Sequence, residues 1–367
     1  MDAEHQVKVA SPLQELIRAW KLGKDGQYHF ASPADQHASR GTVFGGFDSY
    51  DEVHVESTKK WFSFAEEYSQ CTQRIGHRQL RNLVSATSEY LFFPSSKCVA
   101  TRYNPSVNKE MEIINMPDRS FITTLHATDD LLVLGSSEGR YALRSLIGDE
   151  STRSGTVVSA CLTNQVYSCR SRAGPVQAVF SSNDGSLRVL DVRTERWEVP
   201  QEFDEPVNCA ASSPDGNARV LVFDNKDPCI VDADGKPISK LSGHTRSGFA
   251  CAWAPEGHNI ATAYEDGFVN IYDDRTYRRF AHIRAQQRCI RSLQFSSSTN
   301  GPPLLIAAEE NDIVHIYNAQ TFETEQRIEN VGELSGISFA PDGQSLFVGN
   351  AERGISKYQQ LPALLNG

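Results

Sequence analysis

Short apolar runs recur along the chain from about residue 70 onwards. Most are about four to six residues long and rich in β-branched and aromatic side chains, which is the usual composition of β-strands. Polar turns separate the runs, and a helical spacing of apolar residues is nearly absent from this part of the chain. The pattern predicts an all-β fold built from short antiparallel strands.

One strand–turn–strand unit repeats seven times. In each unit a short polar turn precedes an apolar run such as "FVNIYD" or "IVHIYN", and the turns stand at positions 97, 138, 184, 225, 266, 311 and 352. Successive turns are therefore 41, 46, 41, 41, 45 and 41 residues apart. A period of about 40 to 45 residues is typical of WD40 repeats, each of which forms one four-stranded blade. The spacing predicts a seven-bladed WD40 β-propeller.

Two further sequence markers follow the same repeat. Pro-Asp-Gly or Pro-Glu-Gly turns occur within Ser212–Gly216, Trp253–Gly257 and Phe339–Gly343, where proline presets the first turn position and glycine suits the last. A Gly-His dipeptide, ending at His77 and at His244, precedes the closing aromatic residue of its unit. Both markers are typical of WD-type repeats and support the same fold.

The WD-type residues are expected to stabilise the blades. The histidine of Gly-His can bond the acidic residue of the turn, which pairs polar groups buried between blades. In the unit that matches the pattern best, we expect His244 to bond Asp266, supported by Tyr272. The structural residues predicted in this way are His77, His244, Asp184, Asp266, Tyr272 and Asp273.

Three parts of the chain differ in pattern. Residues 1–70 form an N-terminal extension, residues 71–360 the propeller, and residues 361–367 a C-terminal tail. The extension is expected to be helical or irregular, with a short capped helix near residues 12–22 whose apolar stripe packs on the propeller or engages a partner. Residues 53–66 are the candidate for an outer strand that closes the ring.

Composition limits the possible function classes. The 367 residues are 39% apolar and 22% charged, so the chain can bury a core. A net charge of −10 without a basic block makes nucleic acid an unlikely partner. The eight cysteines form no C-x-x-C pair, and we expect reduced core thiols and no metal. Without a signal peptide or an apolar run of about 18 residues, the expected location is the cytoplasm, the nucleus or both, with no membrane contact.

Three stretches resemble a known family more closely than a generic WD repeat does. They are Gly76–Asn104, Arg288–Glu323 and Gly332–Tyr358, with a His-x-Gln-Leu-Arg opening and an Arg-Ser-Leu-x-Phe…Val-His-Ile-Tyr unit. Over residues 76–358 the chain resembles WD-repeat proteins of fungi and plants that carry a DUF2415-type region. Some relatives in that family resemble substrate receptors of the GID-type ubiquitin ligase. The resemblance implies a receptor or adaptor role.

One catalytic motif matches formally. Gly135–Gly139 fits G-x-S-x-G, but a nucleophile elbow needs a strand, a turn and then a helix, and here the motif lies between two strand-like runs. No H-E-x-x-H, Walker-A or EF-hand pattern occurs. We therefore expect no catalysis and no cofactor.

The loops around the central channel are the expected binding surface. Function on a rigid scaffold usually lies in such loops, and arginine with tyrosine suits peptide recognition. The candidate partner-binding residues are Arg246, Arg288, Tyr264, Glu309, Glu310 and Arg78.

The expected function is a non-catalytic scaffold that binds a peptide or protein at this rim. Its sharpest form is a substrate receptor or adaptor that binds ubiquitin ligase subunits and substrates. A solvated rim without a partner is one alternative. A chromatin- or RNA-associated regulatory propeller and a propeller that binds a small molecule are others.

Overall fold

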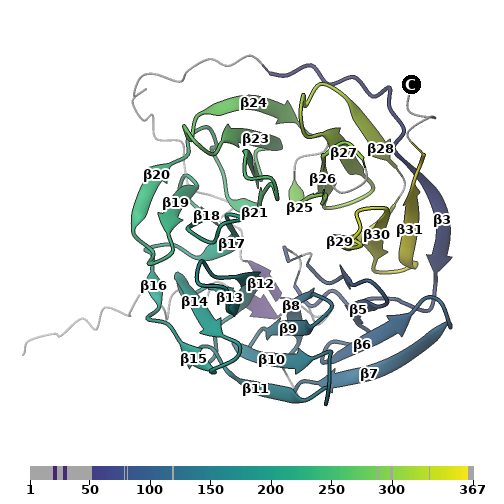
Figure 1. The fold of residues 1–367 in the computed structure, drawn as a ribbon, viewed down its shortest axis with the longest axis vertical. Coiled ribbons are helices and arrows are strands. Elements are labelled where there is room, and N and C mark those ends of the chain that lie inside the picture. The colour runs from purple at the N-terminus through teal and green to yellow at the C-terminus, as the bar shows by residue number, and fades with distance from the viewer. Residues whose placement is uncertain are drawn as a thin grey trace, which may run out of the picture.

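Seven antiparallel sheets stand around a central axis in the computed structural model (Figure 1). The structure describes residues 20–22 and 28–30 as backbone, and residues 52–77, 79–80, 82–117, 120–286, 289–297, 301–329 and 331–362 in full. Six of the seven sheets have four strands and one has five, and the described residues contain no helix. The all-β, seven-bladed fold expected from the repeat spacing is confirmed.

Within a blade the strands follow the chain outwards from the channel, in the order a, b, c and d. Blade 1 consists of β4 (Ser85–Ala86), β5 (Leu91–Pro94), β6 (Val99–Asn104) and β7 (Lys109–Asn115). Blade 2 consists of β8 (Ile122–Ala127), β9 (Leu131–Ser136), β10 (Arg140–Ser145) and β11 (Thr152–Thr156). Blade 3 consists of β12 (Thr163–Arg170), β13 (Val176–Ser182), β14 (Ser186–Asp191), β15 (Arg196–Trp197) and β16 (Gln201–Glu202).

Blades 4 to 6 repeat this plan, whereas the outermost strand of blade 7 comes from the N-terminal side of the ring. Blade 4 consists of β17 (Val207–Ser212), β18 (Ala218–Phe223), β19 (Cys229–Asp232) and β20 (Pro237–Lys240). Blade 5 consists of β21 (Gly248–Trp253), β22 (Asn259–Tyr264), β23 (Phe268–Asp273) and β24 (Arg279–Arg284). Blade 6 consists of β25 (Ile290–Phe295), β26 (Leu304–Glu309), β27 (Val314–Asn318) and β28 (Glu325–Ile328). Blade 7 consists of β29 (Leu334–Phe339), β30 (Ser345–Asn350), β31 (Gly354–Gln360) and β3 (Phe62–Tyr68).

Strand β3 closes the ring from the N-terminal side. It pairs antiparallel with β31, from Phe62 opposite Gln360 to Tyr68 opposite Ile355, and Figure 1 shows the two ends of the colour scale side by side there. Gln326 of blade 6 secures the start of β3: its Oε1 accepts from the backbone N–H groups of Trp61 and Phe62 at 2.6 and 2.8 Å. The outer strand of blade 7 thus begins at Phe62, within the segment proposed for closure.

Residues 52–60, which we call the strap, run along the outer edges of blades 5 and 6 (Figure 1). The backbone N–H of Val53 donates to His282 at 3.0 Å, and Glu56 exchanges backbone hydrogen bonds with the segment 323–325 at 2.8 and 3.0 Å. Val53 and Val55 pack against the apolar cluster below. The strap therefore covers sheet edges that would otherwise be open to another chain.

The N-terminal helix expected near residues 12–22 falls largely outside the described residues. The three that are described, Trp20–Leu22, form strand β1, which pairs antiparallel with β2 (Tyr28–Phe30). The expectation is wrong for these three residues. A helical stripe and a short strand are both compatible with so few apolar positions, and pairing with a second aromatic-rich segment decides between them.

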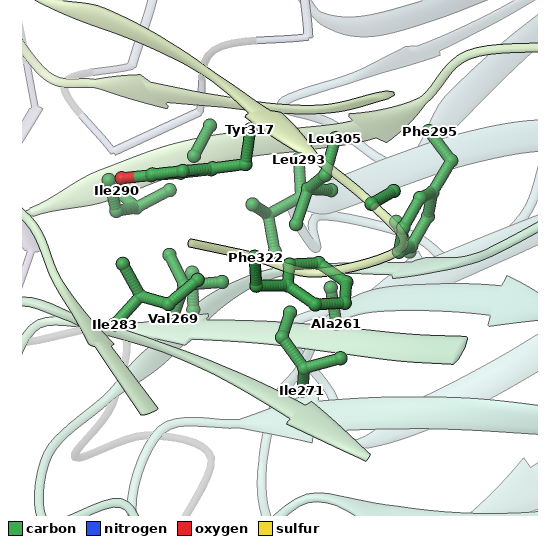
Figure 2. Close-up of a cluster of buried hydrophobic side chains, with 14 of the residues drawn as sticks. Ala261, Val269, Ile271, Ile283, Ile290, Leu293, Phe295, Leu305, Tyr317 and Phe322 are labelled. Carbon is green, nitrogen blue, oxygen red and sulfur yellow. The ribbon is translucent and has the colours of Figure 1, made fainter. Parts of the chain in front are cut away.

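The hydrophobic core lies between neighbouring blades. One cluster joins blades 5 and 6, and Figure 2 shows Phe322 near the centre of a group that includes Ile271 and Leu293. Phe322, in the c–d turn of blade 6, is fully buried. Because each blade buries both faces of its sheet in this way, the seams between blades hold the ring together.

Hydrogen bonds from side chains also link the innermost strands around the channel. Among the described residues, a side chain accepts from a backbone N–H of the next blade at 2.7 to 3.4 Å in six of the seven seams: Ser85–Ala127, Thr124–Val166, Gln165–Ala210, Cys209–Cys251, Gln294–Phe339 and Ser338–Ala86. At the seam between blades 5 and 6, Ala250 occupies the position that Cys209 has in blade 4, after the same β-bulge. The alanine side chain contains no hydrogen-bond acceptor. The apolar cluster of Figure 2 joins that seam instead.

Candidate functional site

Blade 5 contains the hydrogen-bond network expected from its Gly-His. The Nδ1 of His244 lies 3.0 Å from Asp266 Oδ2, and its Nε2 lies 2.8 Å from Thr262 Oγ1. Burial lowers the pKa of His244. Burial by itself would raise the pKa of Asp266, but the interactions with His244 and the backbone hydrogen bonds from Phe268 and Thr245 together outweigh it and lower the pKa of that carboxyl. A neutral imidazole thus donates to an ionised carboxylate, and Tyr272 adds a bond from its hydroxyl to Ser242 O at 3.0 Å. The network stabilises the scaffold.

The other predicted structural residues lie in turns or the core. Asp184 forms an ion pair with Arg188 at 2.7 Å instead of bonding a histidine. Asp273 accepts from the Arg275 guanidinium at 2.6 Å, which lowers the pKa of Asp273 to about 2. His77 is buried ahead of blade 1, where its Nδ1 accepts from a backbone N–H at 3.4 Å. These residues cap turns or fill the core.

The formal G-x-S-x-G motif is a hairpin turn. Gly135 belongs to β9, Gly139 has φ of 66°, and β10 follows directly. The strand–turn–helix geometry of a nucleophile elbow is therefore absent here. Among the described residues no group of three or more His, Cys, Asp or Glu side chains could hold a metal ion. No helix of the described chain is long and apolar enough to cross a membrane.

We call the two ends of the channel the d–a mouth, surrounded by the d–a loops and b–c turns, and the a–b mouth, surrounded by the a–b and c–d turns. Two residues predicted to bind a partner at the d–a mouth are buried instead. Tyr264 is 0% exposed, stacks on His244 with ring centroids 3.8 Å apart, and donates to Lys226 O at 3.3 Å. Glu309 is also 0% exposed. Both end strand b, where the alternation of side chains turns them into the seam, so neither can contact a partner.

Glu309 belongs to a buried network in blade 6 that the sequence did not indicate. His315 lies between Glu309, 2.7 Å from its Nε2, and Glu325, 3.0 Å from its Nδ1. Burial by itself lowers the pKa of His315, but the hydrogen bonds and charges of the two glutamates raise it. Arg327 pairs with Glu325. The sequence offers one indication of this network: in the "VHIY" run, His315 stands at the position that Asn270 occupies in blade 5.

The next residue along each b–c turn does reach the d–a mouth. The backbone N–H of Glu265 donates to Ser247 O at 2.8 Å, and that of Glu310 donates to Cys289 O at 2.9 Å. Asp224 stands at the same position in blade 4. Three neighbouring blades therefore present carboxylates here, which we call the acidic arc (Asp224, Glu265 and Glu310).

The charges at this mouth are partly removed from water. Burial raises the pKa of Asp224, as do the charges of Glu205 and Glu265, although Asn208 donates to its carboxylate at 2.8 Å. Arg291, only 6% exposed, pairs with Glu310 at 3.0 Å. Its guanidinium also stacks 3.9 Å above the ring of Phe249.

Of the predicted arginines, one lies within the described residues. Arg246 is exposed on the d–a loop of blade 5 and has no ion pair within the described chain. Arg78 and Arg288 lie outside the described residues. The predicted site therefore reduces to Arg246 and Glu310, with Asp224, Glu265 and Arg291 as neighbours that the sequence did not reveal.

A cavity of about 660 Å³ occupies the other end of the channel. The innermost strands of all seven blades line it, and it reaches the a–b turns at Pro214, Pro255 and Pro341. Its position was not predicted, because the sequence repeats do not show how inner strands pack around an axis.

Comparisons agree with this architecture. Residues 235–273 match the model of the WD domain, G-beta repeat. A chain in a crystal structure of the mitotic checkpoint complex superposes with a TM-score of 0.67 over 89% of this chain and 99% of that chain, at 13% identity. The fold is that of a seven-bladed β-propeller carrying a WD40 repeat, a class that typically mediates protein interactions.

Sequence relatives are more distant. Pre-mRNA-processing factor 19 homolog 2 of Arabidopsis thaliana is 25% identical over 74% of this chain and 50% of its own length. An uncharacterized protein of Schizosaccharomyces pombe is 26% identical over 48% of this chain and 56% of its own length. The LST8 homolog of Drosophila melanogaster is 27% identical over 29% of this chain and 37% of its own length. The chain thus spans about half the length or less of these relatives.

Proposed function

We propose that the protein is a non-catalytic scaffold that binds a segment of a partner protein at the d–a mouth, in the cytoplasm or nucleus. The observation that carries this proposal is the acidic arc beside Arg291 and the exposed Arg246. Glu310 is already paired with Arg291, but Asp224 and Glu265 leave negative charge at this mouth, and a partner that supplies opposite charges would complement it. A chain of the same fold occurs in the mitotic checkpoint complex, which supports a role in an assembly.

The finer form of the proposal is a substrate receptor or adaptor of a ubiquitin ligase. It rests on the resemblance of residues 76–358 to the family with a DUF2415-type region. In this form the protein binds a ligase core stably, and the turnover of other proteins depends on it. The charge of −10 does not favour nucleic acid as the partner.

Affinity capture with mass spectrometry from the native cell tests both forms. The full chain is compared with Arg246→Glu, with Glu265→Lys, and with the control Glu112→Lys on the exposed outer strand β7. We expect one set of proteins to be lost, roughly tenfold or more, with the two mouth variants only. Ligase subunits in every sample would support the receptor form, and their absence from all samples would remove it. A partner set unchanged by either mouth variant would contradict the proposed surface.

A further inference from the structure

The cavity at the a–b mouth has a mixed lining in which two groups of side chains stand out. The larger apolar side chains of blades 5 to 7, which we call the apolar wall, are Trp253, Pro255, Pro341 and the largely buried Phe295 and Phe339, and the same blades also contribute Ser292, Gln294, Ser297 and Ser338. On blades 2 and 3 the polar side chains His126, Ser168 and Arg170, which we call the polar wall, lie among apolar lining residues such as Val166. A ligand that fits such a cavity has an apolar part and a polar part.

His126 offers a fixed hydrogen-bond donor. The backbone N–H of Ser168 donates to His126 Nδ1 at 3.2 Å, so the ring proton must reside on Nε2. Burial lowers the pKa of His126 to about 4, so the ring is neutral near pH 7 and keeps this tautomer. No acceptor for the Nε2–H occurs within the described part of the chain. The polar wall therefore presents a donor to the cavity.

Arg170 provides the positive charge of the polar wall. It ends β12 at the mouth and is exposed, and its side chain has no ion pair or hydrogen bond with a described residue. The other charged lining residue, Asp129, is already engaged, since the backbone N–H and the hydroxyl of Ser88 both lie 2.7 Å from its carboxylate. Asp129 keeps its negative charge, but Arg170 is the charged lining residue without a hydrogen-bond partner among the described residues, and a guanidinium suits a carboxylate.

The apolar wall and the channel backbone limit the mode of recognition. Trp253 is half-buried and lines the cavity, so its indole offers a large rigid surface at small entropic cost. Backbone N–H groups of the inner strands, such as those of Ala127 and Ala210, already donate to side chains of the neighbouring blade. A bound segment would therefore be recognised by side chains and not by adding a strand.

We propose that this cavity binds an acidic segment of a partner protein that carries a large apolar side chain. The apolar side chain would lie on Trp253, and a carboxylate would accept from Arg170 and His126. A volume of about 660 Å³ lies within the usual range of ligand sites. Nucleic acid fits poorly, because phosphates recruit several cations and the lining has one.

The inference rests on the proposed function, that the protein binds partner proteins, but it uses the opposite end of the channel. Segments of two proteins could then be held at the same time. That arrangement is what an adaptor requires.

Selection of a random peptide library on the full chain, followed by fluorescence polarisation with the selected peptides, tests the site. We expect the selected peptides to combine acidic residues with an aromatic or large aliphatic one. Arg170→Glu and Trp253→Ala should each weaken binding roughly tenfold or more. The matched control, Arg193→Glu in the exposed c–d turn of blade 3, should leave the affinity within about twofold. Because Arg170 is exposed, its variant reports on binding without a risk to folding.

Three outcomes would overturn the inference. They are selected peptides without acidic residues, affinities unchanged by both Arg170→Glu and Trp253→Ala, and no enrichment over a selection on the double variant. The same measurements with Arg246→Glu separate the two mouths. Cellular partners that depend on Arg246, together with no peptide that depends on Arg170, would remove this site and leave the proposed function standing.

Discussion

At the scale of single residues, the His244 network is the best test of the scaffold. His244→Ala removes bonds to Asp266 and Thr262 and the stacking partner of Tyr264. Because buried polar groups lose their partners, we expect a loss of about 2 to 3 kcal/mol in the free energy of unfolding. Urea unfolding at pH 7 measures it. The control His258→Ala, at an exposed turn, should change it by less than about 0.5 kcal/mol, and an equally small loss for His244→Ala would contradict the network.

His315 gives the molecule a pH dependence with a defined sign. Its pKa is raised in the folded state by Glu309 and Glu325, so its contribution is complete below the unfolded value of about 6.5 and is lost as the pH rises through the folded value. The stability difference between the native chain and His315→Gln should therefore shrink from pH 6 to pH 9. One proton limits the slope to about 1.4 kcal/mol per pH unit. A difference that grows with pH would contradict a charged His315.

At the scale of elements, the closure of the ring depends on Gln326. Its side chain accepts from Trp61 N and Phe62 N and donates to Phe62 O at 2.7 Å. Gln326→Ala leaves these buried groups without partners, and we expect a loss of about 2 to 3 kcal/mol on unfolding in urea. Limited proteolysis should cut the variant faster near β3. Gln320→Ala, at an exposed turn, is the control, and equal cleavage of the two variants would argue against this role.

At the scale of the whole molecule, the sequence predicted the repeated parts well. The spacing of the turns predicted the seven blades, because each blade contains one b–c turn. The pairing of His244 with Asp266 was predicted from a motif that lies within one blade. Features that join different blades could not be predicted in this way. The strap, the His315 network and the cavity all depend on which segments meet in space.

Within the candidate site, the sequence also did not show which side of its strand each residue occupies. Tyr264 and Glu309 were placed at the mouth because they precede the turn, yet strand alternation turns them inwards, whereas Glu265 and Glu310 reach the mouth. An error of one residue in a strand exchanges the buried side for the exposed side. Glu310 was predicted to lie at the mouth, together with its buried neighbour Glu309. Asp224 occupies the equivalent position in blade 4 and was not predicted.

Closure of the ring by β3 also imposes a delay during synthesis of the chain. Tyr68 pairs with Ile355, which follows it by 287 residues. At about 5 to 20 residues per second, a ribosome needs roughly 15 to 60 s between the two. Until β31 has been made, β3 has no partner strand in the ring. A growing chain therefore carries β3 with unpaired edges throughout this interval, and chaperones or other nascent chains can reach them.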